Sequence, residues 1–274
     1  MSKVTIAIIG LNGYLGKHVL NAINSGVFDS KIQFPVKAIT RKEGSQSTDK
    51  IKYIVSPETS PDDANLIDSL KGVDAIVELT GPNPELFSKI EKIVEKVKPK
   101  FFENQHSQAV RKLGIKVVDI ITAFFAVPGS FLYEQAGGVG ITEKGVNLIG
   151  DIDQKFHVSK LEDVGNVVLA VATHQPYSDL PDTIHVASEV ITVKDVIDRY
   201  EKSKGIKLDI ISKKSAEEGK KEFVDKLNAG FNPKDFLFYL QVIVAQGLDK
   251  GTYFSKLDNE LVNPNESLWN WGKF

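Results

Sequence analysis

Apolar and polar positions follow two alternating periods along the first part of the chain. Short apolar runs indicate buried strands, and stretches with apolar residues three or four apart indicate helices with one buried face. The predicted strands are residues 4–9, 36–39, 51–55 and 73–79. The predicted helices are residues 16–24, a helix that has Ser60 as its N-cap and ends at Gly72, and residues 84–97. This strand–helix alternation predicts parallel βαβ units and an α/β fold with a doubly wound Rossmann sheet.

The alternation is interrupted after Pro99. Residues 100–104 are the only candidates for a fifth strand, and a helix at 105–113 follows directly. A sixth strand is predicted at 115–121, where the sequence is IKVVDII. The fifth strand is therefore expected to be unusually short, with almost no loop after it.

The remainder of the chain predicts a second, mixed lobe. Strands are expected at 146–149, 156–158, 183–187 and 207–211, and helices at 161–173, 192–205, from 215 onward and at 233–246. Ser159, Thr192 and Ser215 have the spacing of N-caps. Helix 233–246 is apolar on almost every side, so we expect it to be buried in the lobe or against a partner subunit, which leaves a homodimer open. We expect a Rossmann domain at 1–175 and a smaller α+β substrate lobe at 176–274, with segments that cross between them.

Composition narrows the class of protein. The chain has 274 residues, of which 42% are hydrophobic and 26% charged, values typical of a soluble globular protein. A formal net charge of -2 argues against nucleic acid or a membrane surface as a partner. There is no cysteine and the five histidines lack ligand spacing, so no metal site is expected. With no targeting segment and no apolar run of membrane-spanning length, we expect a cytoplasmic protein.

The stretch IAIIGLNGYLG at 6–16 places three glycines between the first predicted strand and the first predicted helix. This context is the one that a dinucleotide-binding turn requires. Gly10 permits a tight turn, Gly13 lets a pyrophosphate approach the backbone, and Gly16 allows the helix to pack closely. The helix N-terminus would supply amides for the anion. A glycine-rich corner without a ligand is the alternative. The other residues of the turn that we expect to contact the cofactor are Asn12, Tyr14 and Leu15.

The second predicted strand ends at Thr40, Arg41 and Lys42. A site for NAD places a carboxylate near this strand end to accept hydrogen bonds from the ribose 2′-hydroxyl. A 2′-phosphate instead requires cationic donors, and arginine can bind it with two hydrogen bonds. The sequence therefore favours NADP(H), with these three residues in its site. Alternatively, Arg41 and Lys42 are surface charges of a polar turn that also contains Glu43.

The end of the fourth predicted strand supplies a further part of the expected site. Thr80, Gly81 and Pro82 follow this strand. Ligands of open parallel sheets bind at the carboxyl ends of strands, so we expect these residues to lie along the cofactor. An ordinary turn before the next helix is the alternative.

Several of these segments resemble one family of proteins. GLNGYLG, AITRK and SLKGVDAIVELTG are similar to sequences of the NmrA-like and isoflavone-reductase-like family of atypical short-chain dehydrogenases/reductases. LGIKVVDIITAFFA and KFHVSKLEDVGNVVLAVAT extend the resemblance over most of the chain, and NPNESLWNW resembles fungal members. The resemblance implies a Rossmann domain, NADPH and a small substrate lobe. It also implies reduction of a small aromatic or otherwise unsaturated molecule or, as in some relatives, redox sensing without catalysis.

The chain departs from this family after the fifth strand. Reductases of the family have a Ser/Glu-containing turn there, and a catalytic lysine begins the next helix. In this chain the positions that correspond to the start of that helix are Glu103, Asn104 and Gln105, and none of them is a lysine. The longer loop that the family has between the fifth strand and this helix is also absent. Either the loop is deleted, which leaves a cofactor binder without the usual acid/base residue, or the written sequence omits a stretch between Lys100 and Gln105. We therefore assign no catalytic residue.

Other reactive side chains give weaker signals. Tyr200 and Lys204 match the YxxxK pattern of typical short-chain dehydrogenases, but they lie at the end of a predicted helix in the second lobe, so we interpret them as a solvated terminus. His106 is near the expected nicotinamide end of the sheet, where it is either a proton donor or a surface histidine. Ser107 and Ser130 have no nearby constellation of histidine and aspartate that would activate a nucleophile.

A group of aromatic residues follows the sixth predicted strand, where an apolar substrate pocket could form. Core packing between the two lobes explains the same pattern equally well. These residues are Phe124, Phe125, Phe131 and Tyr133.

Three functions are consistent with these observations. The first is an NADPH-dependent oxidoreductase that transfers hydride to a small apolar molecule. The second is a non-catalytic NADP(H) sensor, and the third is a Rossmann-like module for protein–protein interaction.

Overall fold

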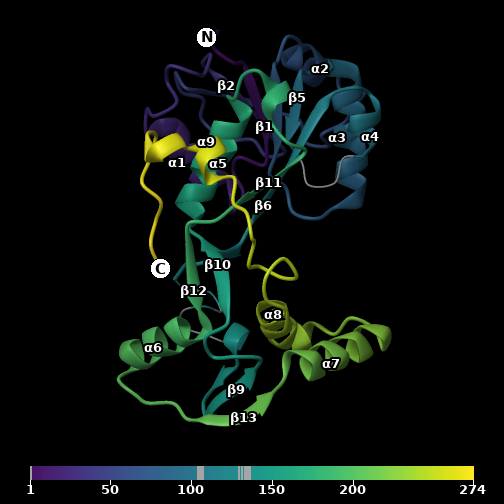
Figure 1. The fold of residues 1–274 in the computed structure, drawn as a ribbon. Coiled ribbons are helices and arrows are strands. Elements are labelled where there is room, and N and C mark those ends of the chain that lie inside the picture. Colours follow the sequence, from purple (N-terminus) through teal and green to yellow (C-terminus); the bar gives the residue numbers. More distant parts are fainter. Residues whose placement is uncertain (1, 104–107, 129, 131, 133–136) are drawn as a thin grey trace. The chain divides into compact units, whose positions relative to one another are not determined.

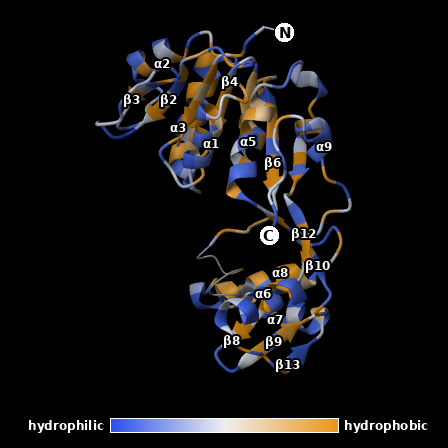
Figure 2. Cartoon of the chain, turned by 90° about the vertical axis from the view of Figure 1, so that its left-hand side faces the viewer, coloured by the Kyte–Doolittle hydropathy of each residue, from blue (hydrophilic) through white to orange (hydrophobic). Residues whose placement is uncertain are grey.

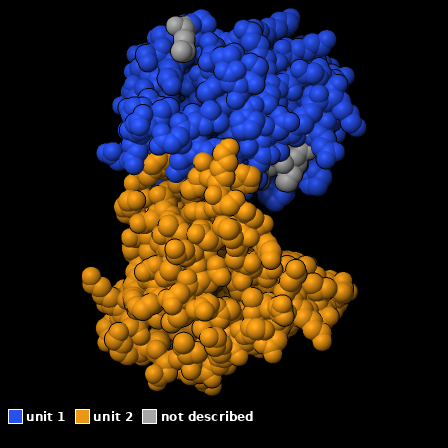
Figure 3. Space-filling model, viewed as in Figure 1, with its two compact units in different colours: residues 1–121, 162–184, 258–270 blue, residues 122–161, 185–257, 271–274 orange. Residues whose placement is uncertain are grey.

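The computed structural model describes residues 2–103, 108–128, 130, 132 and 137–274. The chain divides into two compact units (Figure 3). Unit 1 comprises residues 1–121, 162–184 and 258–270, and unit 2 comprises residues 122–161, 185–257 and 271–274. We expected a boundary at residue 175 with segments that cross between the domains, and each of these two units is made of three separate segments of the chain.

A seven-stranded sheet forms the centre of unit 1 (Figure 1). Its order is β11-β6-β5-β4-β1-β2-β3, and the neighbouring strands from β6 to β3 pair in parallel. The strands are β1 (Ile6–Ile9), β2 (Val36–Thr40), β3 (Ile51–Val55), β4 (Ala75–Glu78), β5 (Phe101–Glu103), β6 (Lys116–Thr122) and β11 (Thr183–Val186). This confirms the predicted α/β Rossmann fold. Because the strand order reverses between β1 and β4, the carboxyl ends of these two strands border the crevice in which such sheets bind ligands.

Helices cover both faces of this sheet. They are α1 (Gly16–Asn24), α2 (Ala64–Leu70), α3 (Pro84–Val97), α4 (Gln108–Lys112) and α5 (Leu161–Ala172), and the short α9 (Asn259–Val262) lies near the end of the chain. In Figure 1, α2, α3 and α4 lie on one face, and α1 and α5 lie on the other. On the first face, strand residues such as Ile76 and Phe102 form one buried cluster with Leu66 of α2 and Ile90 of α3. The hydrophobic colouring of the strands in Figure 2 shows how apolar this sheet is.

Helix α5 packs very closely against α1. A Cβ atom at Gly165 would lie 2.5 Å from both the carbonyl carbon and the carbonyl oxygen of His18. At the start of α5, Glu162 Oε1 lies 3.4 Å from His18 Nδ1. The glycine of the LEDVG segment is therefore required by helix packing, since any side chain there would push the two helices apart.

The helix boundaries in unit 1 mostly follow the sequence pattern, and the largest difference is at the start of α2. α1 and α3 have the predicted bounds. Ser60 is wrong as the N-cap of α2, because Asp63 Oδ1 accepts the hydrogen bond from Leu66 N at 3.1 Å. The hydroxyl of Ser60 instead accepts from Asp62 N at 3.2 Å in the turn that precedes the helix. Ser60 and Asp63 can both cap a helix, and Asp63 is the cap because it lies directly before the first residue of α2.

Unit 2 contains two three-stranded sheets, β12-β10-β7 and β13-β9-β8. Their strands are β7 (Phe124–Phe125), β8 (Ile141–Thr142), β9 (Gly145–Ile149), β10 (Lys155–Ser159), β12 (Glu189–Thr192) and β13 (Ile210–Lys214). The main helices are α6 (Val193–Lys204), α7 (Ala216–Asn228) and α8 (Phe236–Ala245). Capping boxes begin α6 at Thr192 and α7 at Ser215, which confirms those two predictions.

Three details of unit 2 correct the sequence interpretation. Ser159 does not cap α5: it is the last residue of β10, and its buried hydroxyl makes no hydrogen bond within the described structure. Strand 207–211 begins later, as β13, because Glu201 accepts hydrogen bonds from Lys207 Nζ and Leu208 N and holds both outside the sheet. The predicted helix 233–246 begins later, as α8 at Phe236, and its first two residues are exposed, whereas every residue from Phe238 to Ala245 is buried or partly buried as expected.

Candidate functional site

The glycine turn between β1 and α1 is closed by its own backbone. Gly13 N donates a hydrogen bond to Gly10 O at 2.8 Å. Gly10 has φ +92°, a conformation that side chains disfavour, and a Cβ there would lie 3.0 Å from the carbonyl carbon of Leu79. Gly10 is therefore required both by the turn and by the close approach of the segment that follows β4.

The other two glycines of the turn have different roles. A Cβ at Gly16 would lie 2.3 Å from Leu11 O and 2.4 Å from Gly10 O, so this position has no room for a side chain. A Cβ at Gly13 would approach only Gly10 O, at 3.0 Å. Gly16 is thus fixed by the packing of helix α1 on the turn, whereas Gly13 borders open space.

The N-terminus of α1 has no negative group of its own. Leu15 occupies the N-cap position without a side-chain hydrogen bond, and the first turn contains no acid. In contrast, Asp63 caps α2 and Asn83 caps α3. Lys17 N and His18 N already donate to Gly13 O and Leu15 O, whereas the amides of Tyr14 and Leu15 make no hydrogen bond within the described structure. These two amides, just before α1, and the positive end of the helix dipole are consequently available to an anion from outside the chain.

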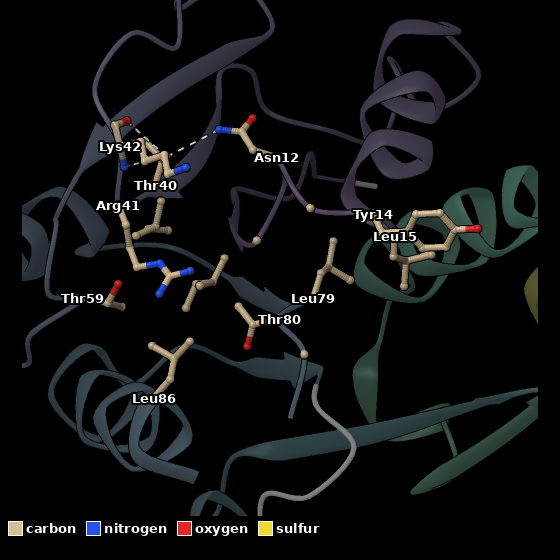
Figure 4. A pocket seen from close by; sticks show the side chains of 15 residues that line it. Asn12, Tyr14, Leu15, Thr40, Arg41, Lys42, Thr59, Leu79, Thr80 and Leu86 are labelled. Atoms are coloured by element: carbon tan, nitrogen blue, oxygen red, sulfur yellow. Dashed lines mark hydrogen bonds between the residues drawn. The ribbon is translucent and has the colours of Figure 1, made fainter. Parts of the chain in front are cut away.

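A cavity of about 570 Å³ opens at the carboxyl ends of β1, β2 and β4 (Figure 4). It is lined by Ile9, Gly10, Asn12, Gly13, Tyr14, Leu15, Ile39, Thr40, Arg41, Lys42, Thr59, Leu79, Thr80, Gly81 and Leu86. The volume is within the range of small-molecule sites. The structure thus brings the three predicted parts of the site together at the switch point of the sheet, with Thr59 and Leu86 added to them.

Most residues expected to contact a cofactor line this cavity, but Gly16 and Pro82 do not. Gly16 is buried beneath the turn, and Pro82 is exposed just before the N-cap of α3. Sequence reasoning missed Thr59, which is buried in the loop after β3 with φ +44°, and Leu86 in the first turn of α3. The one feature of the sequence that could have indicated Thr59 is its place in the loop that follows the predicted strand 51–55.

The cavity has cations along the end of β2. The side chains of Arg41 and Lys42 are exposed, and neither forms an ion pair with any residue that the structure describes. Figure 4 shows the guanidinium of Arg41 extending into the cavity between Thr59 and Thr80. The hydroxyl of Thr40 accepts a hydrogen bond from Lys42 N at 3.3 Å and thereby closes the short turn that contains Arg41.

Carboxyl groups lie at the ends of β4 and β5. Glu78 Oε1 accepts hydrogen bonds from the backbone N of Thr80, at 2.6 Å, and from the hydroxyl of Thr80. Glu103, which the apolar pattern placed in the fifth strand and the family resemblance at the start of the next helix, is the last residue of β5 and is 5% exposed. Burial raises the pKa of Glu103 well above its ordinary value, and the charge of Glu78 raises this pKa further. Glu103 is therefore a neutral acid over a pH range in which a solvated glutamate is charged.

Of the three positions at which the family resemblance implies a lysine, Glu103 ends β5 and the other two follow it. Asn104, Gln105, His106 and Ser107 lie outside the described residues. The strand before them is regular, since Phe101, Phe102 and Glu103 pair with β4 on one side and with β6 on the other. The short fifth strand is thus a complete part of the sheet.

The aromatic residues proposed for substrate belong to unit 2. Phe124 pairs with Val158 of β10, and its ring meets the ring of Phe156 edge-on at 6.3 Å between centroids. Phe125 is the second residue of β7 and is half-buried. Phe131 and Tyr133 lie outside the described residues. Contact of these residues with a substrate remains a prediction.

Other candidates from the sequence do not form a site. Tyr200 and Lys204 lie in the last turns of α6, with Lys204 Nζ 5.8 Å from the centroid of the Tyr200 ring. Within the described ranges, no group of three histidine or acidic side chains is arranged to hold a metal ion. No helix in the described part of the chain is long and apolar enough to span a bilayer.

Comparison with known proteins supports the fold. No family model matches the chain, and no curated protein matches it by sequence. The solved structure of an isoflavone reductase is similar with a TM-score of 0.63 and 17% identity, over 88% of this chain and 87% of that one. Triphenylmethane reductase from Citrobacter sp., complexed with NADP(H), gives 0.59 and 17% over 94% and 95%. An NADPH-dependent quinone oxidoreductase from Escherichia coli, complexed with NADPH, gives 0.61 and 14% over 98% and 96%.

Proposed function

We propose that this protein is an NADP(H)-dependent oxidoreductase of the isoflavone-reductase-like or NmrA-like type. The observation that supports this most strongly is the cavity at the switch point of the sheet. An uncapped helix N-terminus lies on one side of it, and on the other lies Arg41, which forms no ion pair with the residues that the structure describes. Two structures with this fold, among those compared above, were solved with NADP(H) or NADPH bound.

The residues that line the cavity fit the parts of this cofactor. Amides at the start of α1, next to Gly13, would bind the pyrophosphate. Arg41 and Lys42 would bind the 2′-phosphate, because both are exposed and unpaired within the described chain. Leu86 and Thr59 would border the adenosine, since they lie near the same strand ends. When bound, NADPH supplies a hydride from C4 of its nicotinamide.

The proposed substrate is a small apolar or aromatic molecule, held by unit 2. Phe124 and Phe125 would provide an apolar surface, together with Phe131 and Tyr133. The protein would act mainly by orienting the two reactants and excluding water, since no general acid is assigned. In this proposal unit 1 is the cofactor-binding domain and unit 2 the substrate lobe.

A non-catalytic NADP(H) sensor is the second candidate. It is favoured by the lack of a lysine at Glu103, Asn104 and Gln105, where the family resemblance implies the catalytic residue. An intact mass of the protein from its natural source tests the underlying deletion. A mass of 30.2 kDa means that the loop is truly absent, and a larger mass means that the written sequence omits it.

Two measurements test the proposed function. The first is the melting temperature with and without NADPH, for which ligand at about 100 times Kd contributes about 2.7 kcal/mol. A rise of roughly 5–10 °C is then expected for a chain of this size. The second is NADPH oxidation with a panel of enones, quinones and aldehydes. Binding with turnover supports the reductase and binding without turnover the sensor, whereas no thermal shift would exclude both and favour an interaction module.

A further inference from the structure

The loop between β2 and β3 is held by side chains rather than by its backbone. Residues 43–47 make no backbone–backbone hydrogen bond within the described structure. Two serines fix the loop instead: Ser45 Oγ accepts from Asn12 Nδ2 at 3.0 Å, and Ser47 Oγ accepts from Tyr53 N at 3.0 Å. The position of Arg41, at the start of this loop, therefore depends on a few polar contacts.

Asn12 contacts the chain on both sides of Arg41. Its Nδ2 donates to Ser45 Oγ, beyond Arg41, and also lies 3.5 Å from Thr40 Oγ1, just before Arg41 (Figure 4). Thr40 Oγ1 in turn receives the hydrogen bond from Lys42 N. Since Asn12 belongs to the glycine turn, its amide connects the expected pyrophosphate-binding turn to the loop with the cations.

Tyr53 determines which way this amide points. The Tyr53 hydroxyl, on β3, donates to Asn12 Oδ1 at 3.1 Å. With Oδ1 used in this way, the Nδ2 donors of the amide are directed to Ser45 and Thr40. Tyr53 also donates its backbone N to Ser47, so the same residue fixes the loop at two places. Tyr53 itself does not line the cavity.

We propose that Tyr53 is a positioning residue for cofactor selection: through Asn12 it holds the loop so that Arg41 meets the 2′-phosphate while the glycine turn binds the pyrophosphate. This inference rests on the proposed function. It predicts that Tyr53 matters for NADPH and much less for NADH, because NADH has no 2′-phosphate to interact with Arg41. A tyrosine that only stabilised the fold would affect both nucleotides equally.

The test is titration of the full chain with NADPH and with NADH. For Tyr53→Phe, loss of one hydrogen bond is expected to weaken NADPH binding about two- to tenfold. NADH binding should change by less than about twofold, and the melting temperature without nucleotide should stay close to that of the wild type, as for most surface substitutions. Ser45→Ala is expected to act in the same direction. Tyr200→Phe, which removes a hydroxyl in unit 2, is the matched control and should change neither affinity.

A double-mutant cycle with Arg41→Ala decides whether Tyr53 acts through Arg41. If it does, Tyr53→Phe has no further effect on NADPH once Arg41 is removed. An undiminished effect in the Arg41→Ala background, or equal losses for NADPH and NADH, would overturn the inference while leaving the proposed function intact. A wild-type protein that binds neither nucleotide would reject both.

Discussion

The ends of β2 and the ends of β4 and β5 lie along the same carboxyl edge of the sheet, yet they have opposite chemistry. At β2, Arg41 and Lys42 are exposed cations without ion-pair partners among the described residues. At β4 and β5 the corresponding residues are the acids Glu78 and Glu103, and Glu103 is almost completely buried. An exposed, unpaired cation is available to an anionic ligand, whereas a buried carboxyl keeps its proton. The end of β2 is therefore suited to binding phosphate, and we call it the phosphate-binding half of the edge. The ends of β4 and β5, which we call the acidic half, are not suited to it.

The two halves meet at the glycine turn, and the largest expected effect concerns that turn. Gly16→Ala places a Cβ 2.3 Å from Leu11 O, a distance that the backbone can relieve only by shifting α1. Overpacking of this kind is expected to cost about 3 kcal/mol. For this chain length that corresponds to a decrease in melting temperature of roughly 6–12 °C, measured by circular dichroism. An unchanged melting temperature would contradict the tight packing of α1 on the turn.

Glu103 gives a smaller, pH-dependent effect that tests the acidic half. Its pKa is raised in the folded protein by burial and by Glu78, while the unfolded chain ionises near the ordinary value of 4.5. The unfolded state therefore binds fewer protons than the folded state above that pH, so the free energy of unfolding decreases as the pH rises towards the raised pKa. Glu103→Gln removes this dependence, because glutamine does not titrate.

The measurement is the difference in melting temperature between Glu103→Gln and wild type from pH 4.5 upward. This difference is expected to shift in favour of the variant as the pH rises. Glu95→Gln, which removes an exposed carboxylate of α3, is the control and should show little pH dependence. A constant difference for Glu103→Gln across the range would mean that Glu103 is already ionised in the folded protein.

Gly13→Ala is expected to have the smallest effect on stability while still reducing cofactor binding. The added Cβ meets only Gly10 O, at 3.0 Å, so the melting temperature should fall by much less than for Gly16→Ala. Gly13 also lines the cavity, and a methyl group there would stand where the pyrophosphate is expected. Reduced NADPH affinity with a nearly unchanged fold is the expected result. Equal affinities for wild type and variant would place the pyrophosphate elsewhere.

Local sequence signals predicted the parts of the fold and site that local interactions determine. The bounds of α1 and α3 matched, and Arg41 lay in the cavity because strand ends of a parallel sheet converge there. Asp63 was missed as a cap because Ser60 and Asp63 have similar capping ability, and only the packed helix distinguishes them. Tyr53 was missed because its hydroxyl donates to Asn12, which lies 41 positions away in the sequence. The spacing of apolar and polar residues does not predict a contact over that distance.

The division into units was also beyond local reasoning. From the sequence we expected segments to cross between the domains, but we placed only the boundary at residue 175 and did not identify the segments that cross. In the structure β7 pairs with β10, and residues 122–161 join unit 2 before the chain returns to unit 1 at residue 162. Pairing between distant strands decides such a division, and the hydrophobic pattern of each strand does not identify its partner.

The most direct test of the phosphate-binding half is a comparison of NADPH and NADH affinities in wild type and in Arg41→Ala. Charge-assisted hydrogen bonds contribute about 1.5–3 kcal/mol, so the variant should lose about ten- to a hundredfold in NADPH affinity. NADH affinity should change by less than about threefold, and Lys92→Ala, which removes an exposed cation of α3 outside the cavity, should change neither. Equal losses for both nucleotides in Arg41→Ala would contradict the account, because they would remove Arg41 from the 2′-phosphate site.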